Sequence, residues 1–151
     1  MNATALPYIM STVVPPLQKS PDERPNILVA DDEDQILNVV SKLVTFEQYG
    51  AITARDGNEA LALYQECPEE ISAVITDLNM PGMSGLELSL RIRDTHPDIP
   101  ILIMSGNFEE TIVRSLMQCR GYYLLRKPFT VGQFRNQLDK MMPNKRTAAA
   151  A

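Results

Sequence analysis

Short apolar runs alternate with segments of helical hydrophobic spacing through most of this chain. The runs have the length of strands and read NILVA, AITAR, SAVIT, IPILIM and YYLL, at residues 26–30, 51–55, 72–76, 99–104 and 122–125. In the segments between them, apolar residues recur three and four positions apart, as at Ile36, Leu37, Val40, Leu43 and Val44. A strand that is apolar at consecutive positions needs cover on both faces. The alternation therefore predicts an α/β fold with a parallel sheet between two layers of helices.

One helical segment carries a contrary signal. From Leu86 to Ile92 apolar and polar residues alternate, which is the spacing of a strand. We nevertheless predict a helix, because the segment lies between two apolar runs and is rich in Leu, Glu and Arg, which favour helices. Two more helices are predicted from Phe108 to Met117 and from Val131 to Met142. Right-handed crossovers between the strands then favour a doubly wound sheet.

Polar side chains follow four of the five predicted strands. The four clusters are Asp31-Asp32-Glu33-Asp34, Asp77 with Leu78-Asn79-Met80-Pro81-Gly82, Ser105-Gly106-Asn107, and Arg126-Lys127-Pro128. In a doubly wound sheet, ligands bind beyond the carboxyl ends of the strands. We therefore expect the four clusters to meet in one crevice.

Together, these side chains suit metal-assisted phosphoryl chemistry. Asp31, Asp32 and Asp77 would crowd three carboxylates together, and a divalent cation such as Mg²⁺ relieves their repulsion. A carboxylate held beside the cation is a plausible nucleophile toward phosphorus. Ser105 and Lys127 would supply a hydroxyl donor and a positive charge for the phosphoryl oxygens.

Each cluster also has a purely structural interpretation. Asp31 and Asp32 could cap the helix that follows them, and Asp77 could open a turn. Ser105 could cap a helix that begins near Asn107. The functional interpretation is favoured because four separate strand ends each carry a group that a phosphoryl site needs.

The composition excludes several classes of protein. With 14 Lys and Arg against 19 Asp and Glu, the 151-residue chain has a net charge of −5, which argues against direct nucleic-acid binding. No apolar run approaches the roughly 20 residues that span a bilayer. Cys67 and Cys119 are expected to be unpaired, buried or half-buried thiols, which fits the reducing cytoplasm. His96 is expected on the surface.

The two ends of the chain differ from its middle. Residues 1–25 hold five of the 11 prolines without sustained periodicity, and are predicted to be a flexible tail. Residues 143–151 end in four alanines and are predicted to be a second tail or a cloning remnant. One domain is therefore expected, at residues 26–142.

The motifs of this domain resemble those of receiver domains in two-component response regulators. The matching stretches are ILVADDE, VITDLNMPGMSGLEL, ILIMSG and RKPF. The resemblance implies a flavodoxin-like (βα)5 fold with strand order 2-1-3-4-5. It also implies a cis peptide bond between Lys127 and Pro128.

In this family an aspartate accepts a phosphoryl group from a sensor histidine kinase or a histidine phosphotransfer protein, and the resemblance gives that role to Asp77. Asp32, Asp77, the backbone carbonyl of Asn79 and, through water, Asp31 would hold Mg²⁺ or Mn²⁺. Ser105 and Lys127 would bind the phosphoryl oxygens. No enzymatic activity is expected beyond self-catalysed phosphorylation and slow autodephosphorylation.

The resemblance also implies a switch. The hydroxyl of Ser105 would move toward the phosphoryl group, and this would reshape the surface formed by the fourth helix, the fifth strand and the fifth helix. Many receivers have an aromatic residue three positions before the lysine, where this chain has Leu124. Either aromatic gating is lost, or Tyr123 acts from a shifted register.

Several functions remain open from the sequence. The chain could be a free-standing receiver, a receiver segment of a larger hybrid histidine kinase or regulator, or a docking module that is not phosphorylated. A monomer or weak dimer is expected, with an unknown downstream partner and no membrane insertion. A nucleotide- or flavin-binding protein is disfavoured because Asp31-Asp32-Glu33-Asp34 would repel phosphate. A metal-dependent hydrolase would need a separate general acid, for which His96 is poorly placed.

Overall fold

A computed structural model describes residues 24–143 of the chain. Within this range five strands form one parallel sheet in the order β2-β1-β3-β4-β5, which confirms the predicted topology. The strands are β1 (Asn26–Ala30), β2 (Gly50–Ala54), β3 (Ile71–Asp77), β4 (Ile101–Ser105) and β5 (Tyr122–Arg126). The helices are α1 (Asp34–Phe46), α2 (Gly57–Glu66), α3 (Gly85–Thr95), α4 (Glu110–Met117) and α5 (Val131–Met141), with a short 3-10 helix η3 at Pro68–Glu70.

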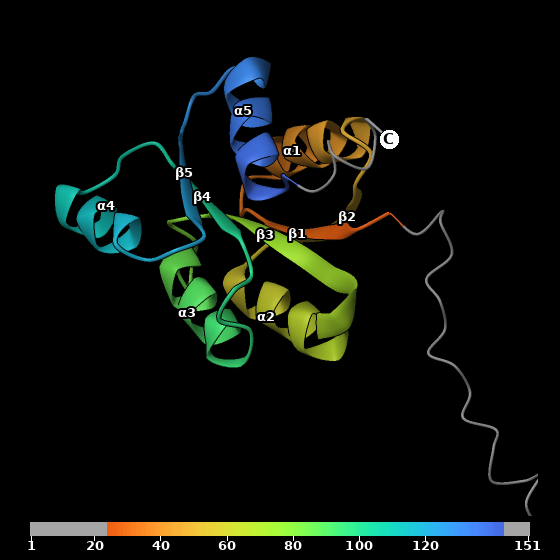
Figure 1. The fold of residues 1–151 in the computed structure, drawn as a ribbon, viewed down its shortest axis with the longest axis horizontal. Coiled ribbons are helices and arrows are strands. Elements are labelled where there is room, and N and C mark those ends of the chain that lie inside the picture. Colours follow the sequence, from red (N-terminus) through yellow and green to blue (C-terminus); the bar gives the residue numbers. More distant parts are fainter. Residues whose placement is uncertain (1–23, 144–151) are drawn as a thin grey trace, which may run out of the picture.

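Two helices cover each face of the sheet, and α4 lies to one side. In Figure 1, α1 and α5 lie on one face and α2 and α3 on the other, whereas α4 projects beyond the β4–β5 side. Two hydrophobic cores result, one on each face of the sheet. Because β1, β3 and β4 are inner strands, their side chains are buried on both faces, as their consecutive apolar residues predict.

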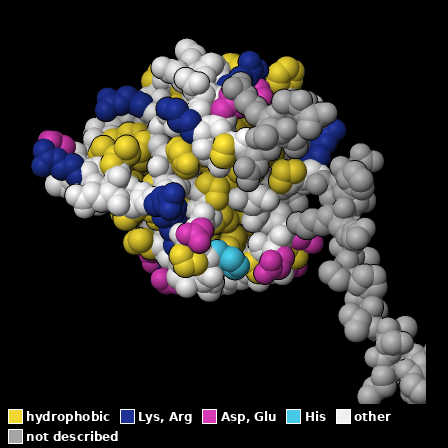
Figure 2. Space-filling model, viewed as in Figure 1, with side chains coloured by type: hydrophobic (Ala, Val, Ile, Leu, Met, Phe, Trp, Pro, Cys, Tyr) yellow, Lys and Arg dark blue, Asp and Glu magenta, His cyan; other side chains and the backbone are white. Residues whose placement is uncertain are grey.

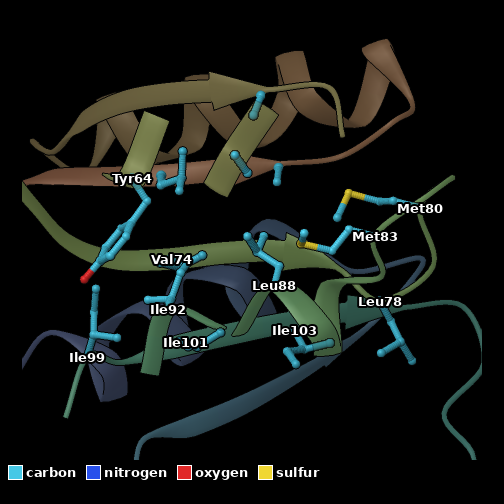
Figure 3. Packing of buried hydrophobic residues seen from close by; sticks show 14 of the residues in the cluster. Tyr64, Val74, Leu78, Met80, Met83, Leu88, Ile92, Ile99, Ile101 and Ile103 are labelled. Carbon is cyan, nitrogen blue, oxygen red and sulfur yellow. The ribbon is translucent and has the colours of Figure 1, made fainter. Parts of the chain in front are cut away.

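The segment with a strand-like pattern is helix α3, as predicted. Its N-cap Ser84 accepts a hydrogen bond from the backbone N–H of Glu87, which satisfies one donor of the first turn. Leu88 and Ile92, four residues apart, are buried and point toward the sheet residues Val74, Ile101 and Ile103 (Figure 3). Leu90, by contrast, is 55% exposed, so the alternating apolar residues of this segment do not form one buried face, as they would in a strand.

Some boundaries and exposures differ from the predictions. Helix α4 begins at Glu110, so Phe108 lies in the preceding loop, packed against the core but outside the helix. Cys67 is half-buried as expected, but Cys119 is exposed because it follows the C-terminal end of α4. His96, expected on the surface, is half-buried there, since its ring packs edge-on against Tyr64 with 5.5 Å between the centroids.

The predicted tails fall almost entirely outside the described residues, at 1–23 and 144–151. Among the helices of residues 24–143, none combines the length and apolar character that crossing a membrane requires.

Two glycines in the first turns of helices α3 and α5 should respond in opposite ways to substitution by alanine. A Cβ at Gly85 would lie 1.9 Å from the backbone oxygen of Asp77, whereas the nearest atom to a Cβ at Gly132 is 3.9 Å away. We expect Gly85→Ala to lower the free energy of unfolding by about 1–3 kcal/mol through overpacking. Gly132→Ala should leave it unchanged or raise it by up to about 1 kcal/mol, because alanine favours helices. Urea denaturation measures both, and equal effects would contradict the close packing at Gly85.

Candidate functional site

Backbone hydrogen bonds bring the carboxyl ends of the strands together. The N–H of Asp31 donates to the carbonyl of Ala54 at 3.2 Å, which joins the ends of β1 and β2. The N–H of Leu78 donates to Met104 and that of Lys127 to Ser105, both at 2.8 Å, which joins β3 to β4 and β4 to β5. The register of β1 and β3 pairs Ala30 with Thr76, so the four sequence clusters lie together along the carboxyl edge of the sheet, as predicted.

The ammonium group of Lys127 lies between two of the carboxylates. Its Nζ is 2.8 Å from Oδ2 of Asp31 and 3.1 Å from Oδ1 of Asp77. Asp31 is fully buried and the Lys127 side chain is only 14% exposed. A buried ion pair of this kind holds its partners in fixed positions, because separating them would leave a charge uncompensated.

Asp32 completes a group of three carboxylates. Asp31, Asp32 and Asp77 each offer an oxygen, and these oxygens all lie within 4.8 Å of one another. One ammonium leaves two of the three negative charges uncompensated, so the donor set fits a hard divalent cation such as Mg²⁺. Asn79, whose carbonyl was predicted as a further ligand, follows Asp77 by two residues and is exposed.

The titration behaviour of the site reflects this imbalance. Burial raises the pKa of Asp77, Lys127 opposes that increase, and the charges of Asp31 and Asp32 add to it. Burial alone would lower the pKa of Lys127, but its contacts with Asp31 and Asp77 outweigh burial and raise it. Lys127 therefore remains charged, and it lies closer to Asp31, so Asp77 is the less compensated of the two carboxylates.

Ser105 is buried at the end of β4, but its hydroxyl is engaged locally. Its Oγ donates to the carbonyl of Asn107 at 2.9 Å and accepts from the N–H of Asn107 at 3.1 Å. The alternative interpretation of Ser105 as a helix cap is wrong, because the N-cap of α4 is Glu109. Ser105 instead fixes the first residues of the loop before α4.

The other structural interpretations can also be compared with the structure. The N-cap residue of α1 is Glu33, without a side-chain cap, and Asp31 accepts a hydrogen bond from its N–H at 2.9 Å. Neither Asp31 nor Asp32 is thus the cap of α1. The peptide bond between Lys127 and Pro128 is cis, as the family resemblance implies.

Thr76 and Gly85 fix the backbone at Asp77 and Leu78, a role that was not predicted from the sequence. The hydroxyl of Thr76 donates to the carbonyl of Asp77 at 3.0 Å, and the N–H of Gly85 donates to Leu78 at 2.8 Å. Any side chain at Gly85 would collide with the backbone of Asp77. The glycine directly after the capping serine was the available signal for this close approach.

Leu124 stands at the position where many receivers have an aromatic residue, and the structure shows its surroundings. Leu124 pairs with Ile103 in the β4–β5 register and packs in the core on the α2–α3 face. Tyr123 packs in the opposite core, and its hydroxyl donates to the carbonyl of Lys140 in α5 at 3.2 Å. Tyr123 therefore lies on the face of the sheet opposite to Leu124 and does not occupy the place of the absent aromatic residue.

Comparisons with known proteins agree with this geometry. The chain is 37% identical over 106 residues to Response regulator RR06 of Streptococcus pneumoniae, covering 70% of this chain and 48% of that protein. It is 31% identical over 116 residues to Sensor kinase CckA of Brucella abortus, covering 77% of this chain and 12% of that protein. The chain thus spans less than half the length of these two relatives.

Solved structures show the same fold. The chemotaxis protein CheY4 of Vibrio cholerae superimposes with a TM-score of 0.71 at 28% identity, covering 78% of this chain and 98% of that one. The receiver domain of the hybrid histidine kinase CckA gives a TM-score of 0.66 at 26% identity with the same coverage. The model of the response regulator receiver domain matches residues 27–139, a range that includes all four strand-end clusters. The protein therefore belongs to the response regulator receiver domains of two-component systems.

Proposed function

We propose that this domain accepts a phosphoryl group on Asp77, in a Mg²⁺-dependent reaction, from a phosphohistidine of a sensor histidine kinase or a phosphotransfer protein. The observation that carries the proposal is the position of the Lys127 ammonium, 2.8 Å from Asp31 and 3.1 Å from Asp77. It lies at the junction of three strand ends, in contact with the carboxylates of both Asp31 and Asp77. This is the arrangement that phosphoryl transfer needs, since that reaction depends mainly on positioning and charge neutralisation.

In the proposed reaction an oxygen of the Asp77 carboxylate attacks phosphorus, and the bond from phosphorus to the histidine nitrogen of the donor breaks. The donor imidazole keeps the electron pair of that bond. Lys127 and the hydroxyl of Ser105 bind phosphoryl oxygens. Asp31, Asp32, Asp77 and the carbonyl of Asn79 would hold Mg²⁺, which supplies neutralisation of the charge on the transferred group.

The switch in this proposal begins at Ser105. To donate to a phosphoryl oxygen, its hydroxyl must leave the carbonyl of Asn107, its present acceptor at 2.9 Å. Residues 106–109 then lose the bonds that fix them, and the N-terminal end of α4 moves. The surface that changes lies between α4 and α5, where hydrophobic side chains gather in Figure 2. A downstream partner would recognise that surface.

The context of the domain is a further part of the proposal. The matched relatives include a response regulator and a sensor kinase that are much longer than this chain. The domain would act either by itself or as the receiver segment of such a protein, in the cytoplasm and as a monomer or weak dimer. A docking module without phosphorylation is the alternative, and the test that follows separates the two.

Incubation with Mg²⁺ and acetyl phosphate should add one phosphoryl group to the intact protein. Asp77→Asn should abolish the gain because the nucleophile is lost, and Asp32→Asn should reduce it severely because a metal ligand is lost. Asp98→Asn, which alters an exposed carboxylate in the α3–β4 loop, is the matched control and should react normally. Intact-mass spectrometry provides the readout. An unchanged mass of the wild-type protein would favour the docking module.

The charge of Asp77 should cost stability in the absence of metal. Since its pKa is raised in the folded state, ionisation destabilises the fold at pH values above its ordinary pKa of 3.8, and this cost vanishes below that pH. Asp77→Asn should therefore unfold at a higher temperature than the wild type at pH 7, and at nearly the same temperature near pH 3.5. Adding Mg²⁺ should stabilise the wild type more than the variant. A variant that is less stable at pH 7 would show that the contact with Lys127 dominates.

Ser105→Ala should uncouple phosphorylation from the loop. The variant should still accept the phosphoryl group, about tenfold more slowly, because Lys127 and the carboxylates remain in place. The amide of Asn107, which loses its acceptor, should exchange rapidly before and after phosphorylation alike. Ser115→Ala, which removes an exposed hydroxyl of α4, is the control and should keep the wild-type response. A phosphorylation-dependent change at Asn107 in Ser105→Ala would contradict the proposed switch.

A further inference from the structure

The guanidinium group of Arg93, near the end of α3, joins three separate parts of the chain. Its Nη1 donates to the carbonyl of Arg120 at 2.8 Å, and its Nη2 donates to the carbonyl of Ile99 at 3.0 Å. Arg120 lies in the turn between α4 and β5, and Ile99 lies just before β4. One rigid planar group therefore connects α3 to the N-terminal ends of β4 and β5.

Tyr122, the first residue of β5, adds two contacts to this connection. Its ring lies beneath the guanidinium of Arg93, 3.9 Å from the centroid to Cζ. Its hydroxyl is 2.9 Å from Oγ of Ser89 in α3, and that Oγ donates to the carbonyl of Leu86 at 2.7 Å. We call this set the Arg93–Tyr122 clamp: the side chains of Ser89, Arg93 and Tyr122 with the carbonyls of Ile99 and Arg120.

The turn before β5 is shaped to fit the clamp. Gly121 has a φ of +83°, and a Cβ at this position would lie 2.7 Å from Nη2 of Arg93. Its carbonyl accepts a hydrogen bond from the N–H of Ile101 at 2.9 Å, which ties the turn to the first residue of β4. The C-terminal end of α4 therefore leads into a turn that is held by α3 and by β4.

The N-terminal end of α4 has no comparable support. Its N-cap Glu109 makes no side-chain cap hydrogen bond, and Leu116, near the other end, is the only one of its eight residues that is buried. The loop before it is fixed by the two hydrogen bonds between Ser105 and Asn107. The N-terminal end of α4, which projects beyond the sheet in Figure 1, is therefore held by these two hydrogen bonds and by the partly buried Phe108 and Ile112, without a clamp of the kind that holds the turn after the helix.

We propose that the Arg93–Tyr122 clamp is the pivot on which α4 moves when the domain is phosphorylated. Residues 106–113 change position while residues 118–122 stay fixed to α3. In this chain Leu124 has no hydroxyl to reorient, and the aromatic residue two positions earlier is a stationary part of the pivot. The inference rests on the proposed function, because the release of Ser105 from Asn107 starts the movement.

Amide hydrogen exchange of the full chain, followed by NMR, tests the pivot. Beryllofluoride with Mg²⁺ serves as the probe, because it stands in for a phosphoryl group on an aspartate. Two amides report on the moving end: Asn107, which donates to Ser105, and Val113, which donates to Glu109. Two report on the fixed end: Cys119, which donates to Leu116, and Ile101, which donates to Gly121.

In the wild type, beryllofluoride should change exchange at Asn107 and Val113 at least about tenfold and leave Cys119 and Ile101 within about twofold. Arg93→Lys cannot hold both carbonyls, and Tyr122→Phe loses the bond to Ser89. Each should speed exchange at Cys119 and Ile101 about tenfold without the probe, and should let the probe change these amides too.

Two matched controls accompany these variants. Arg91→Lys alters the exposed arginine of α3 that pairs with Glu87, and Tyr123→Phe alters the neighbouring tyrosine on the other face of β5. Both should behave as the wild type at the four amides.

The outcomes separate the pivot from the proposed function. If the probe changes Cys119 as strongly as Val113 in the wild type, or if Arg93→Lys affects Cys119 no more than Arg91→Lys does, the pivot is wrong and phosphorylation stands. If the probe shifts no resonance next to the site, at Leu78 or Lys127, the proposed function fails and the pivot fails with it.

Discussion

The ion pairs of Lys127 with Asp31 and Asp77 are the interaction on which the functional edge of this domain depends. Because β1 and β3 are neighbours in the sheet, the carboxylates of Asp31 and Asp77 at their ends lie side by side and repel each other. The compensating ammonium belongs to the residue that follows β5, and β5 lies two strands from β3, hence about 10 Å away across the sheet. Only a long, flexible side chain spans that distance. The site is therefore held by a contact that depends on all the intervening strands being in register.

In the proposed switch, two acceptors compete for the hydroxyl of Ser105. The Ser105 hydroxyl has a neutral acceptor, the carbonyl of Asn107, at 2.9 Å. A phosphoryl oxygen is an ionised acceptor, and hydrogen bonds to charged groups exceed neutral ones by about 1 kcal/mol. In the proposed switch that difference is small, so transfer of the hydroxyl alone would shift the loop only partly. The shift would be effective because, besides the hydrogen bonds of Ser105, only the partly buried Phe108 and Ile112 hold this end of α4 against the core.

The sequence predicted what local patterns encode. The alternation of runs and helical segments identifies the sheet, and the polar residues at strand ends identify Asp31, Asp32, Asp77, Ser105 and Lys127. Contacts between distant residues were not predictable. Tyr122 and Tyr123 are chemically identical neighbours, yet one faces α3 and the other α5, because successive residues of a strand point to opposite faces. Only the β4–β5 register decides which tyrosine meets Ser89.

The need of a buried polar group for a hydrogen-bond partner explains both the leucine at position 124 and the tyrosine at position 122. A buried tyrosine needs a hydrogen-bond partner for its hydroxyl. At position 122 Ser89 supplies that partner, and Arg93 covers the ring. Leu124 pairs with Ile103 and packs in an apolar core, where a side chain without a polar atom suits the surroundings. Because the aromatic group of this face is bonded in place at the far end of β5, the proposed switch assigns the response to charge at Asp77 to the loop before α4 and not to an aromatic side chain of β5.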